Sequence, residues 1–329
     1  LDWTIFSQFD AGVNFSKRDK SRDWHEDYYR AATPATQTVI PSDLLSANAP
    51  AGFAGIPGFL GFDLEAALNR FGTRTPNIDG NTFGRRWAVH EKVTTAFAKL
   101  DIDTQLGSVP IRGNFGLQVV KADQNADGYD QSTSASGAIV AQAVNRGASY
   151  SNVLPSLNLV AELTSDSYVR FGMARSVARP RMDEMRAYNS AGLNRSIDQN
   201  TGQPIFTWSG NGGNPYLRPW VADGFDLSFE RYFGKGSYIS VAGFSKKLKT
   251  YIYNSVTTID YTGFPNQTGN VPSSNFGTFS RPQNGQGGYV DGVEVTISVE
   301  GKLLLPILDG FGVSASGSDT HSGIQRNGP

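Results

Sequence analysis

Short turns and long connections alternate along this chain, between segments in which every second residue is apolar. The segment 224–233 is typical, with Phe225, Leu227 and Phe229 alternating with Asp226, Ser228 and Glu230. This period of two is the signal of a β-strand with one apolar and one polar face. The short turns fall near 107–110, 164–167, 234–236 and 301–309. Long irregular stretches fall near 20–86, 178–219 and 252–287, with a medium one near 126–148. This alternation of short and long connections predicts an antiparallel up-and-down sheet, with short turns at one end and long connections at the other.

About nine segments carry the strand signal. They are 2–16, 92–105, 111–120, 153–163, 168–177, 224–233, 237–250, 289–300 and 311–320. Several reach a dozen residues or more, whereas strands of soluble proteins are usually about 5–6 residues long. The length of 329 residues would ordinarily suggest about two domains, but no linker divides the chain.

Two architectures fit such strands. In a soluble sandwich the apolar faces form the core, and in a transmembrane barrel they meet lipid while the polar faces line a wet lumen. Tyrosine and tryptophan gather near strand ends, as in an interfacial aromatic girdle. We therefore predict an all-β, antiparallel up-and-down transmembrane β-barrel, of which this chain supplies about nine strands.

Composition narrows the function classes. The chain has no cysteine, which removes disulfide frameworks and cysteine-ligated metal sites, and its net charge of −1 gives no basic field for nucleic acid. No apolar run is long enough for a transmembrane helix. A barrel strand needs only about 9–11 residues to cross, so the mean hydropathy of −0.33 remains compatible with a membrane.

A series of motifs, in order along the chain, resembles the C-terminal barrel of TonB-dependent outer-membrane receptors. Gly213 to Pro219 reads GNPYLRP, like the family motif GNP-x-L-[KR]-P, although Trp220 stands where the family usually has Glu. The other matching segments are 9–19, 111–118, 153–159, Arg179-Pro180, 244–247 and 288–294. The proteobacterial branch that this pattern most resembles includes importers of oligosaccharides.

The resemblance implies a 22-strand barrel with an N-terminal plug and a TonB-box segment. Residues 1–329 are therefore expected to be a partial barrel, with the plug and the final strands absent. It also implies a Gram-negative outer-membrane location. The expected partners are outer-membrane lipid, a small-molecule nutrient and, through the plug, a TonB-type energy-coupling protein, with no nucleic acid and no cofactor.

The long connections supply candidate ligand-binding residues. Aromatic faces can stack on the C–H surfaces of sugars, and amides or arginine can bind sugar hydroxyls. The candidates are Trp24, Tyr28, Tyr29, Arg195, Trp208, Asn211 and Tyr261. On the strands, the polar residues expected to face the lumen are Asn158, Glu162, Arg170, Asp226, Glu230, Glu294 and Glu300.

Signals for other chemistry are weak. Asp123 to Gly128 matches the first half of a calcium loop, D-x-[DN]-x-[DN]-G, but the closing acid is replaced by Ser134, and a polar loop with Asn, Asp and Gly turn chemistry fits better. The three histidines are far apart, and no nucleophile elbow or phosphate loop is present. We predict no catalytic and no metal site, and hence no enzyme.

The function predicted from the sequence is active, TonB-coupled uptake of a nutrient, an oligosaccharide first. The alternatives are a siderophore receptor, a passive porin and a soluble β-rich carbohydrate-binding or adhesin module.

Overall fold

A computed structural model describes residues 5–31, 39–51, 55–79, 82–133, 138–264 and 269–324. The chain divides into two compact units, residues 22–86 and the remainder. Trp3, Ser134 and the end of the chain after Ile324 lie outside the described residues. Each unit is described by itself.

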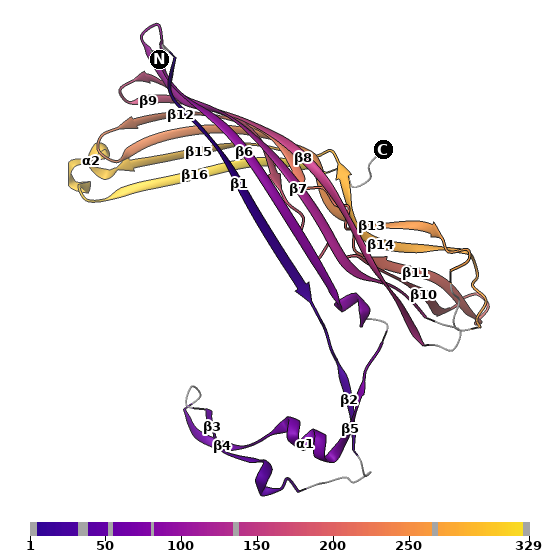
Figure 1. Cartoon of the computed structure of the whole chain (residues 1–329). Coiled ribbons are helices and arrows are strands. Elements are labelled where there is room, and N and C mark those ends of the chain that lie inside the picture. Colours follow the sequence, from indigo (N-terminus) through magenta and orange to yellow (C-terminus); the bar gives the residue numbers. More distant parts are fainter. Residues whose placement is uncertain are drawn as a thin grey trace. The chain divides into compact units, whose positions relative to one another are not determined.

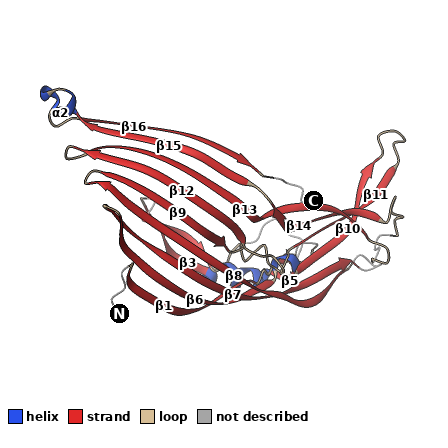
Figure 2. Ribbon diagram, turned by 90° about the horizontal axis from the view of Figure 1, so that it is seen from above, coloured by secondary structure: helices blue, strands red, loops and turns tan. Residues whose placement is uncertain are grey.

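All nine predicted strands form in the larger unit, and several are longer than predicted. They are β1 (Phe6–Arg22), β6 (Trp87–Leu106), β7 (Val109–Thr133), β8 (Ile139–Thr164), β9 (Ser167–Ala178), β12 (Trp220–Phe233), β13 (Ser237–Asp260), β15 (Tyr289–Glu300) and β16 (Gly312–Gly323). Each lies beside the next in this order, and the pairs from β6 to β16 are antiparallel. Figure 2 shows them side by side in one curved sheet. Within the described residues the sheet is open, with β1 and β16 at its edges.

The predicted short turns lie together at one end of the sheet. Gly107 and Gly234 have positive φ angles of 64° and 66° in the β6–β7 and β12–β13 turns, a conformation that glycine adopts without a steric penalty. The β15–β16 connection is the short helix α2 (Gly301–Leu304) followed by a single 3₁₀ turn (Pro306–Leu308). The sheet therefore has its short turns at one end, as the alternation of short and long connections predicted.

Three strands of the larger unit were missed, as were the four strands of the smaller unit, because their residues fall in the stretches predicted to be irregular. Those of the larger unit are β10 (Tyr188–Ile197), β11 (Pro204–Gly212) and β14 (Phe276–Gln286). β10 and β11 form a hairpin that pairs in parallel with the distal end of β7 on one side and with β14 on the other. Figure 1 shows β10, β11, β13 and β14 grouped together at this end. The sequences of β10, β11 and β14 carry no clean alternation of apolar and polar residues.

The apolar face of β7 and β8 is a band with sharp limits. Cross-strand pairs run from Ile111–Ala161 through Phe115–Leu157 to Val119–Val153, and the next pair on the same face is Lys121–Ser151. The span from 111 to 119 is close to the length of about 9–11 residues that crosses a bilayer. β7 and β8 have 25 and 26 residues. Their distal halves therefore extend well beyond this band.

The band shifts along the sheet in the way that tilted strands require. One cross-strand row on the apolar face reads Phe115, Leu157, Met173, Phe225, Ser245, Asp291 and His321. The row is apolar on β7 to β12 and polar on β13 to β16. Strands of outer-membrane barrels are tilted by about 35–45°, so one row perpendicular to the strands leaves the membrane partway across the sheet.

Neighbouring residues of β7 allow a matched test of the two faces. We expect Phe115→Arg to destabilise the folded protein by about 2–4 kcal/mol, because it places a cation in the hydrocarbon layer. Asn114→Arg, on the polar face one residue away, should cost less than about 1 kcal/mol. Urea titration of both variants in lipid vesicles measures the difference, and equal costs would contradict the assignment of the faces.

The smaller unit, residues 22–86, contains two hairpins and a helix. β2 (Asp27–Ala31) pairs with β5 (Gly72–Pro76), and β3 (Leu45–Ala51) pairs with β4 (Ile56–Phe62). Helix α1 (Leu64–Phe71) begins at Asp63, whose carboxylate accepts a hydrogen bond from the Ala66 amide at 3.0 Å, a standard N-cap. In the described part of the chain, no helix has both the length and the apolar character needed to span a membrane.

Candidate ligand site

The seven residues predicted to face the lumen all lie on the polar face of the sheet. Asn158 and Asp226 both lie opposite Gly172, and Glu294 is in the row of Ala242, Ser228 and Arg170. Arg170 donates a hydrogen bond to Glu230 at 2.9 Å. Four of the seven line a shallow pocket of about 430 Å³, namely Asn158, Arg170, Asp226 and Glu294. Their shared face follows from the strand register, and their position in a lumen stays a prediction.

At the distal end, two pieces of chain cross this polar face. The cross-segment, as we call residues 179–187 together with 213–219, contributes Met185, Ala187 and Leu217 to a buried cluster with Trp87 and Val89 of β6. Gln124 of β7 donates hydrogen bonds to the backbone oxygens of Pro215 and Leu217, at 2.7 and 2.8 Å. The GNPYLRP motif is thus held against the wall of the sheet.

A buried carboxylate anchors the start of the cross-segment. Glu91 of β6 has a side chain with no exposed surface, and it accepts hydrogen bonds from Arg18 of β1 and Arg179. Arg179 belongs to the Arg-Pro pair singled out in the sequence. A buried carboxylate shared by two guanidinium groups is costly to break, because removing it leaves cations without a counter-charge.

The second half of the cross-segment fixes the position of an arginine. A Cβ atom on Gly213 would lie 2.2 Å from the carbonyl oxygen of Arg186, so only glycine allows this approach. Asn214 donates from its side chain to the Pro282 oxygen of β14 at 3.0 Å, and its backbone amide donates to the Glu184 oxygen at 2.9 Å. These bonds hold residues 184–186 against β14.

Between the cross-segment, β11, β13 and β14 lies a polar pocket of about 270 Å³, here called the arginine pocket. Its lining residues are Arg181, Asp183, Glu184, Arg186, Asn211, Gly212, Gly213, Asn254, Ser280, Arg281 and Pro282. Three guanidinium groups and two carboxylates therefore line one small space.

The three arginines of the pocket differ in whether they form an ion pair with a carboxylate. Arg181 forms an ion pair with Asp183 at 2.7 Å. Within the described chain Arg186 and Arg281 have no carboxylate partner, and they lie over the rings of Tyr188 and Phe279 at 5.7 and 5.9 Å. The Nε atom of Arg186 is buried without a hydrogen-bond partner. The pocket thus holds two guanidinium groups free to bind anionic oxygen atoms, which arginine recognises through paired donors.

Of the predicted ligand-binding residues, Asn211 alone lines the arginine pocket. Trp208 and Tyr261 are 3% and 4% exposed, and their rings stack at 5.2 Å in a cluster with Phe279. Burial raises the pKa of Tyr261, whose hydroxyl donates to the Thr278 oxygen at 2.9 Å. These two aromatic residues pack the distal strands together and present no free face to a ligand.

The remaining candidates lie elsewhere. Arg195 is exposed near the end of β10. Trp24, Tyr28 and Tyr29 belong to the smaller unit, where the Trp24 ring lies between the guanidinium groups of Arg22 and Arg85, at 5.1 and 5.2 Å. Tyr28 is 57% exposed. Their role in binding a ligand remains a proposal.

The calcium-loop alternative for Asp123 to Gly128 is wrong. These residues form a straight part of β7, so Asp123, Asn125 and Asp127 are spread along one face rather than converging on an ion. Asp123 accepts from Ser149, and Asn145 donates to both Asn125 and Asp127 at 2.7 Å. No group of three metal-ligating side chains occurs among the residues that the structure describes.

Arg181, Arg186 and Arg281 were missed by sequence reasoning. Arg181 and Arg186 follow the Arg-Pro pair, and Arg281 lies in a stretch predicted to be irregular. The sequence signal that could have located these arginines is the GNPYLRP motif. Its glycine and asparagine mark a place where two segments of backbone approach each other closely.

Comparison with known proteins agrees with this fold. The sequence profile of the family "TonB dependent receptor-like, beta-barrel" matches residues 1–327. No curated protein sequence matches the chain.

Among solved structures, a mutant of the ferric enterobactin receptor PfeA of Pseudomonas aeruginosa in complex with enterobactin is 17% identical, with a TM-score of 0.44, over 94% of this chain and 41% of that one. The siderophore receptor PirA of Acinetobacter baumannii is 14% identical, with a TM-score of 0.35, over 64% and 35%. A double mutant of the hemophore receptor HasR of Serratia marcescens, in complex with its hemophore HasA and heme, is 13% identical, with a TM-score of 0.37, over 69% and 35%. The matched part is thus about two fifths or less of each of these chains.

Proposed function

The chain belongs to the TonB-dependent receptor β-barrel family, and from this premise we propose that it takes part in TonB-coupled uptake of a small nutrient across the outer membrane of a Gram-negative cell. The polar face, with Asn158, Arg170 and Glu294, would line the lumen, and the apolar face would contact lipid. The energy-coupling protein would act through a plug, as the family resemblance implies.

The observation that carries the ligand assignment is the arginine pocket. Among the described residues Arg186 and Arg281 have no carboxylate partner, and they line a space of about 270 Å³ at the end of the sheet that carries the long connections. A ligand with anionic oxygen atoms would form charge-assisted hydrogen bonds with both groups. We therefore propose an anionic nutrient.

Two classes of nutrient carry such anionic oxygen atoms. The first is an oligosaccharide that carries acidic sugars. The second is an iron-chelating siderophore with carboxylate or catecholate groups. A neutral oligosaccharide fits less well, because the rings of Trp208 and Tyr261 are buried.

Calorimetry of the detergent-solubilised protein can separate these ligands. The panel contains a neutral oligosaccharide, the same oligosaccharide with uronic acids, a ferric carboxylate siderophore and a ferric catecholate siderophore. We expect binding by an anionic member and none by the neutral sugar. Binding of the neutral sugar alone would overturn the assignment of an anionic ligand.

Energy coupling is tested in cells. Accumulation of the labelled ligand should be lost when the TonB-type protein is deleted, and it should return with a plasmid copy. Accumulation that persists without the TonB-type protein would identify a passive porin instead. A protein that leaves the membrane without detergent would identify the soluble adhesin alternative.

A further inference from the structure

The arginine pocket contains a carboxylate that has no cationic partner. Glu184 is half-buried and lines the pocket together with Arg186 and Arg281. In the described part of the chain Glu184 forms no ion pair, and the one hydrogen bond to its carboxylate comes from the Arg181 amide at 3.4 Å. The Arg181 side chain is paired with Asp183 instead. The pocket therefore offers free acceptor oxygens beside its two free guanidinium groups.

Three uncharged polar side chains complete the lining of the arginine pocket. Asn211 of β11 and Ser280 of β14 are paired residues on neighbouring strands, and Asn254 of β13 lies opposite Pro282 of β14. None of these three side chains has a hydrogen-bond partner within the described residues. Amide and hydroxyl groups can both donate and accept hydrogen bonds. The pocket can therefore bind a ligand that presents donors and acceptors close together.

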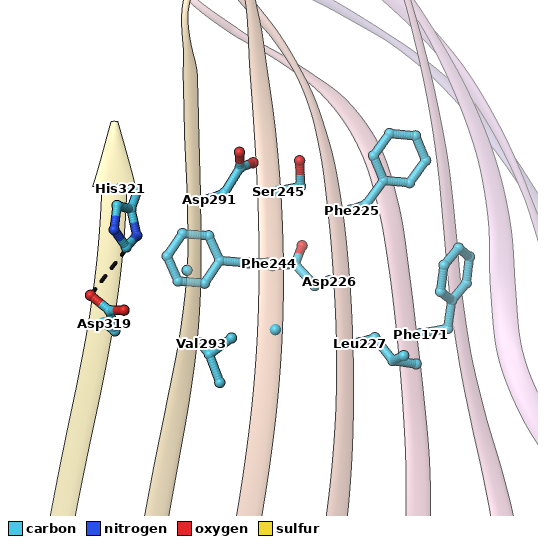
Figure 3. Close-up of a pocket in the computed structure, with 12 residues that line it drawn as sticks. Phe171, Phe225, Asp226, Leu227, Phe244, Ser245, Asp291, Val293, Asp319 and His321 are labelled. Carbon is cyan, nitrogen blue, oxygen red and sulfur yellow. Dashed lines mark ion pairs between the residues drawn. The ribbon is translucent and has the colours of Figure 1, made fainter. Parts of the chain in front are cut away.

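A larger hollow of the sheet does not offer these groups. It measures about 520 Å³, and Phe171, Leu227 and Val293 are among its lining residues. Figure 3 shows these three side chains around the hollow, and the strand register places them in one row of the apolar face. Its described lining contains no arginine or lysine, and in the proposed topology this face contacts lipid. The nutrient is therefore assigned to the arginine pocket, although the hollow is larger.

We infer that the arginine pocket binds a uronic acid residue of an oligosaccharide, and that Glu184 makes the pocket selective for this ligand over a ferric siderophore. The inference rests on the proposed function and narrows its anionic nutrient to one class. The guanidinium groups of Arg186 and Arg281 bind the sugar carboxylate through paired donors. Glu184 accepts a hydrogen bond from a sugar hydroxyl, and Asn211 and Asn254 bind the neighbouring hydroxyls.

The number of hydrogen-bond donors distinguishes the two nutrients. The catecholate or carboxylate oxygens that bind Fe³⁺ in a siderophore have lost their protons, so this part of the complex presents acceptors and negative charge. Glu184 would repel it and would lose water without gaining a donor, which is costly for a half-buried carboxylate. A uronic acid has a carboxylate for the two guanidinium groups and hydroxyl protons for Glu184. The charges and donors of the sugar therefore match those of the pocket.

Calorimetry of the detergent-solubilised protein tests the ligand class. The ligands are trimers of galacturonate and of mannuronate, the methyl esters of both, and a ferric catecholate siderophore. We expect one of the two uronate trimers to bind at least tenfold more tightly than its ester and than the siderophore, in line with hydrogen bonds to charged groups. Equal or tighter binding of the siderophore would overturn this inference and leave the proposed anionic nutrient in place. Absence of binding by every anionic ligand, or equal binding of the ester, would contradict the proposed function itself.

The variant Glu184→Gln separates ligand recognition from a structural role. The glutamine keeps an acceptor for the Arg181 amide and removes the negative charge. Affinity for the uronate trimer should fall roughly tenfold, because a hydrogen bond to a charged group is weakened. Affinity for the siderophore should not fall, because the repulsion is removed.

A glutamate outside the pocket provides the matched control. Glu162, near the short-turn end of β8, lies on the polar face, and Glu162→Gln should leave both affinities unchanged. Heat-modified gel mobility verifies that each variant is folded. A folded Glu184→Gln protein that keeps its affinity for the uronate trimer, or that loses affinity for both ligands equally, would refute the role of Glu184 in selectivity.

Discussion

Replacing Glu91 with alanine is expected to destabilise the folded protein by about 2–4 kcal/mol, the largest loss from any single polar residue described above. Its carboxylate has no exposed surface and is shared by Arg18 and Arg179. Removing one partner of a buried pair typically costs about 3–5 kcal/mol. We expect somewhat less here, because water can reach the two guanidinium groups, whose side chains are 42% and 29% exposed. Urea-induced unfolding in lipid vesicles measures the change.

An exposed ion pair on the same strands provides the control. Asp19 of β1 lies 3.0 Å from Lys17 and 2.6 Å from His90, and its side chain is 45% exposed. Asp19→Asn should cost less than about 1 kcal/mol, as surface pairs usually do. If Glu91→Ala cost no more than Asp19→Asn, Glu91 would not anchor the cross-segment. Protease cleavage within residues 179–187 should also become faster in Glu91→Ala.

Replacing Arg281 with alanine is expected to weaken binding of the anionic nutrient by roughly 10- to 100-fold. This factor corresponds to a loss of about 1.5–3 kcal/mol, the usual contribution of a hydrogen bond to a charged group. Arg281 is the better first target, because its exposed side chain makes no ion pair in the described chain and its removal should leave the fold intact. Arg186→Ala should weaken binding similarly, at some cost to stability, because Arg186 also packs against Gly213.

A matched control uses an arginine that is far from the pocket. Arg112 lies near the short-turn end of β7, 3.8 Å from Asp103, and Arg112→Ala should leave the affinity unchanged. Arg281→Lys should recover only part of the affinity, because an ammonium group lacks the paired donors of a guanidinium. Unchanged calorimetric affinity in Arg281→Ala and in Arg186→Ala would remove the arginine pocket from ligand recognition.

The membrane band could be predicted from the sequence, because its signal is local. Ile111, Phe115 and Val119 alternate with Arg112, Asn114 and Gln118, and lipid on one side with a polar surface on the other requires this alternation. The distal half of β7 could not be found in the same way. Residues such as Gln124, Asn125 and Asp127 are polar on both faces, and they are strand because their backbone pairs with β6 and β8.

The candidate site was beyond sequence reasoning for a different reason. Arg186 and Arg281 are far apart in the chain, and they meet because Gly213 and Asn214 dock residues 184–186 against β14. Trp208 and Tyr261 have the composition of a sugar-binding surface, but their burial depends on a packing partner, Phe279, in a strand that was missed. The residue types predicted that these side chains could bind a sugar. The pairing of β11 with β14 buries them instead, and this pairing could not be read from the sequence.

We propose that the sheet separates lipid from water, with Leu227 on the lipid side and Asp226 on the other. The chain contains no cysteine, so Leu227→Cys and Asp226→Cys each introduce a single labelling site. Each variant is expressed in the outer membrane. One sample is labelled with an environment-sensitive fluorophore and then mixed with brominated lipid, and a second, unlabelled sample is treated with a membrane-impermeant maleimide. We expect quenching by brominated lipid at position 227 and labelling by a membrane-impermeant, water-soluble maleimide at position 226. Lipid quenching at 226, or water-soluble labelling at both positions, would contradict the transmembrane assignment.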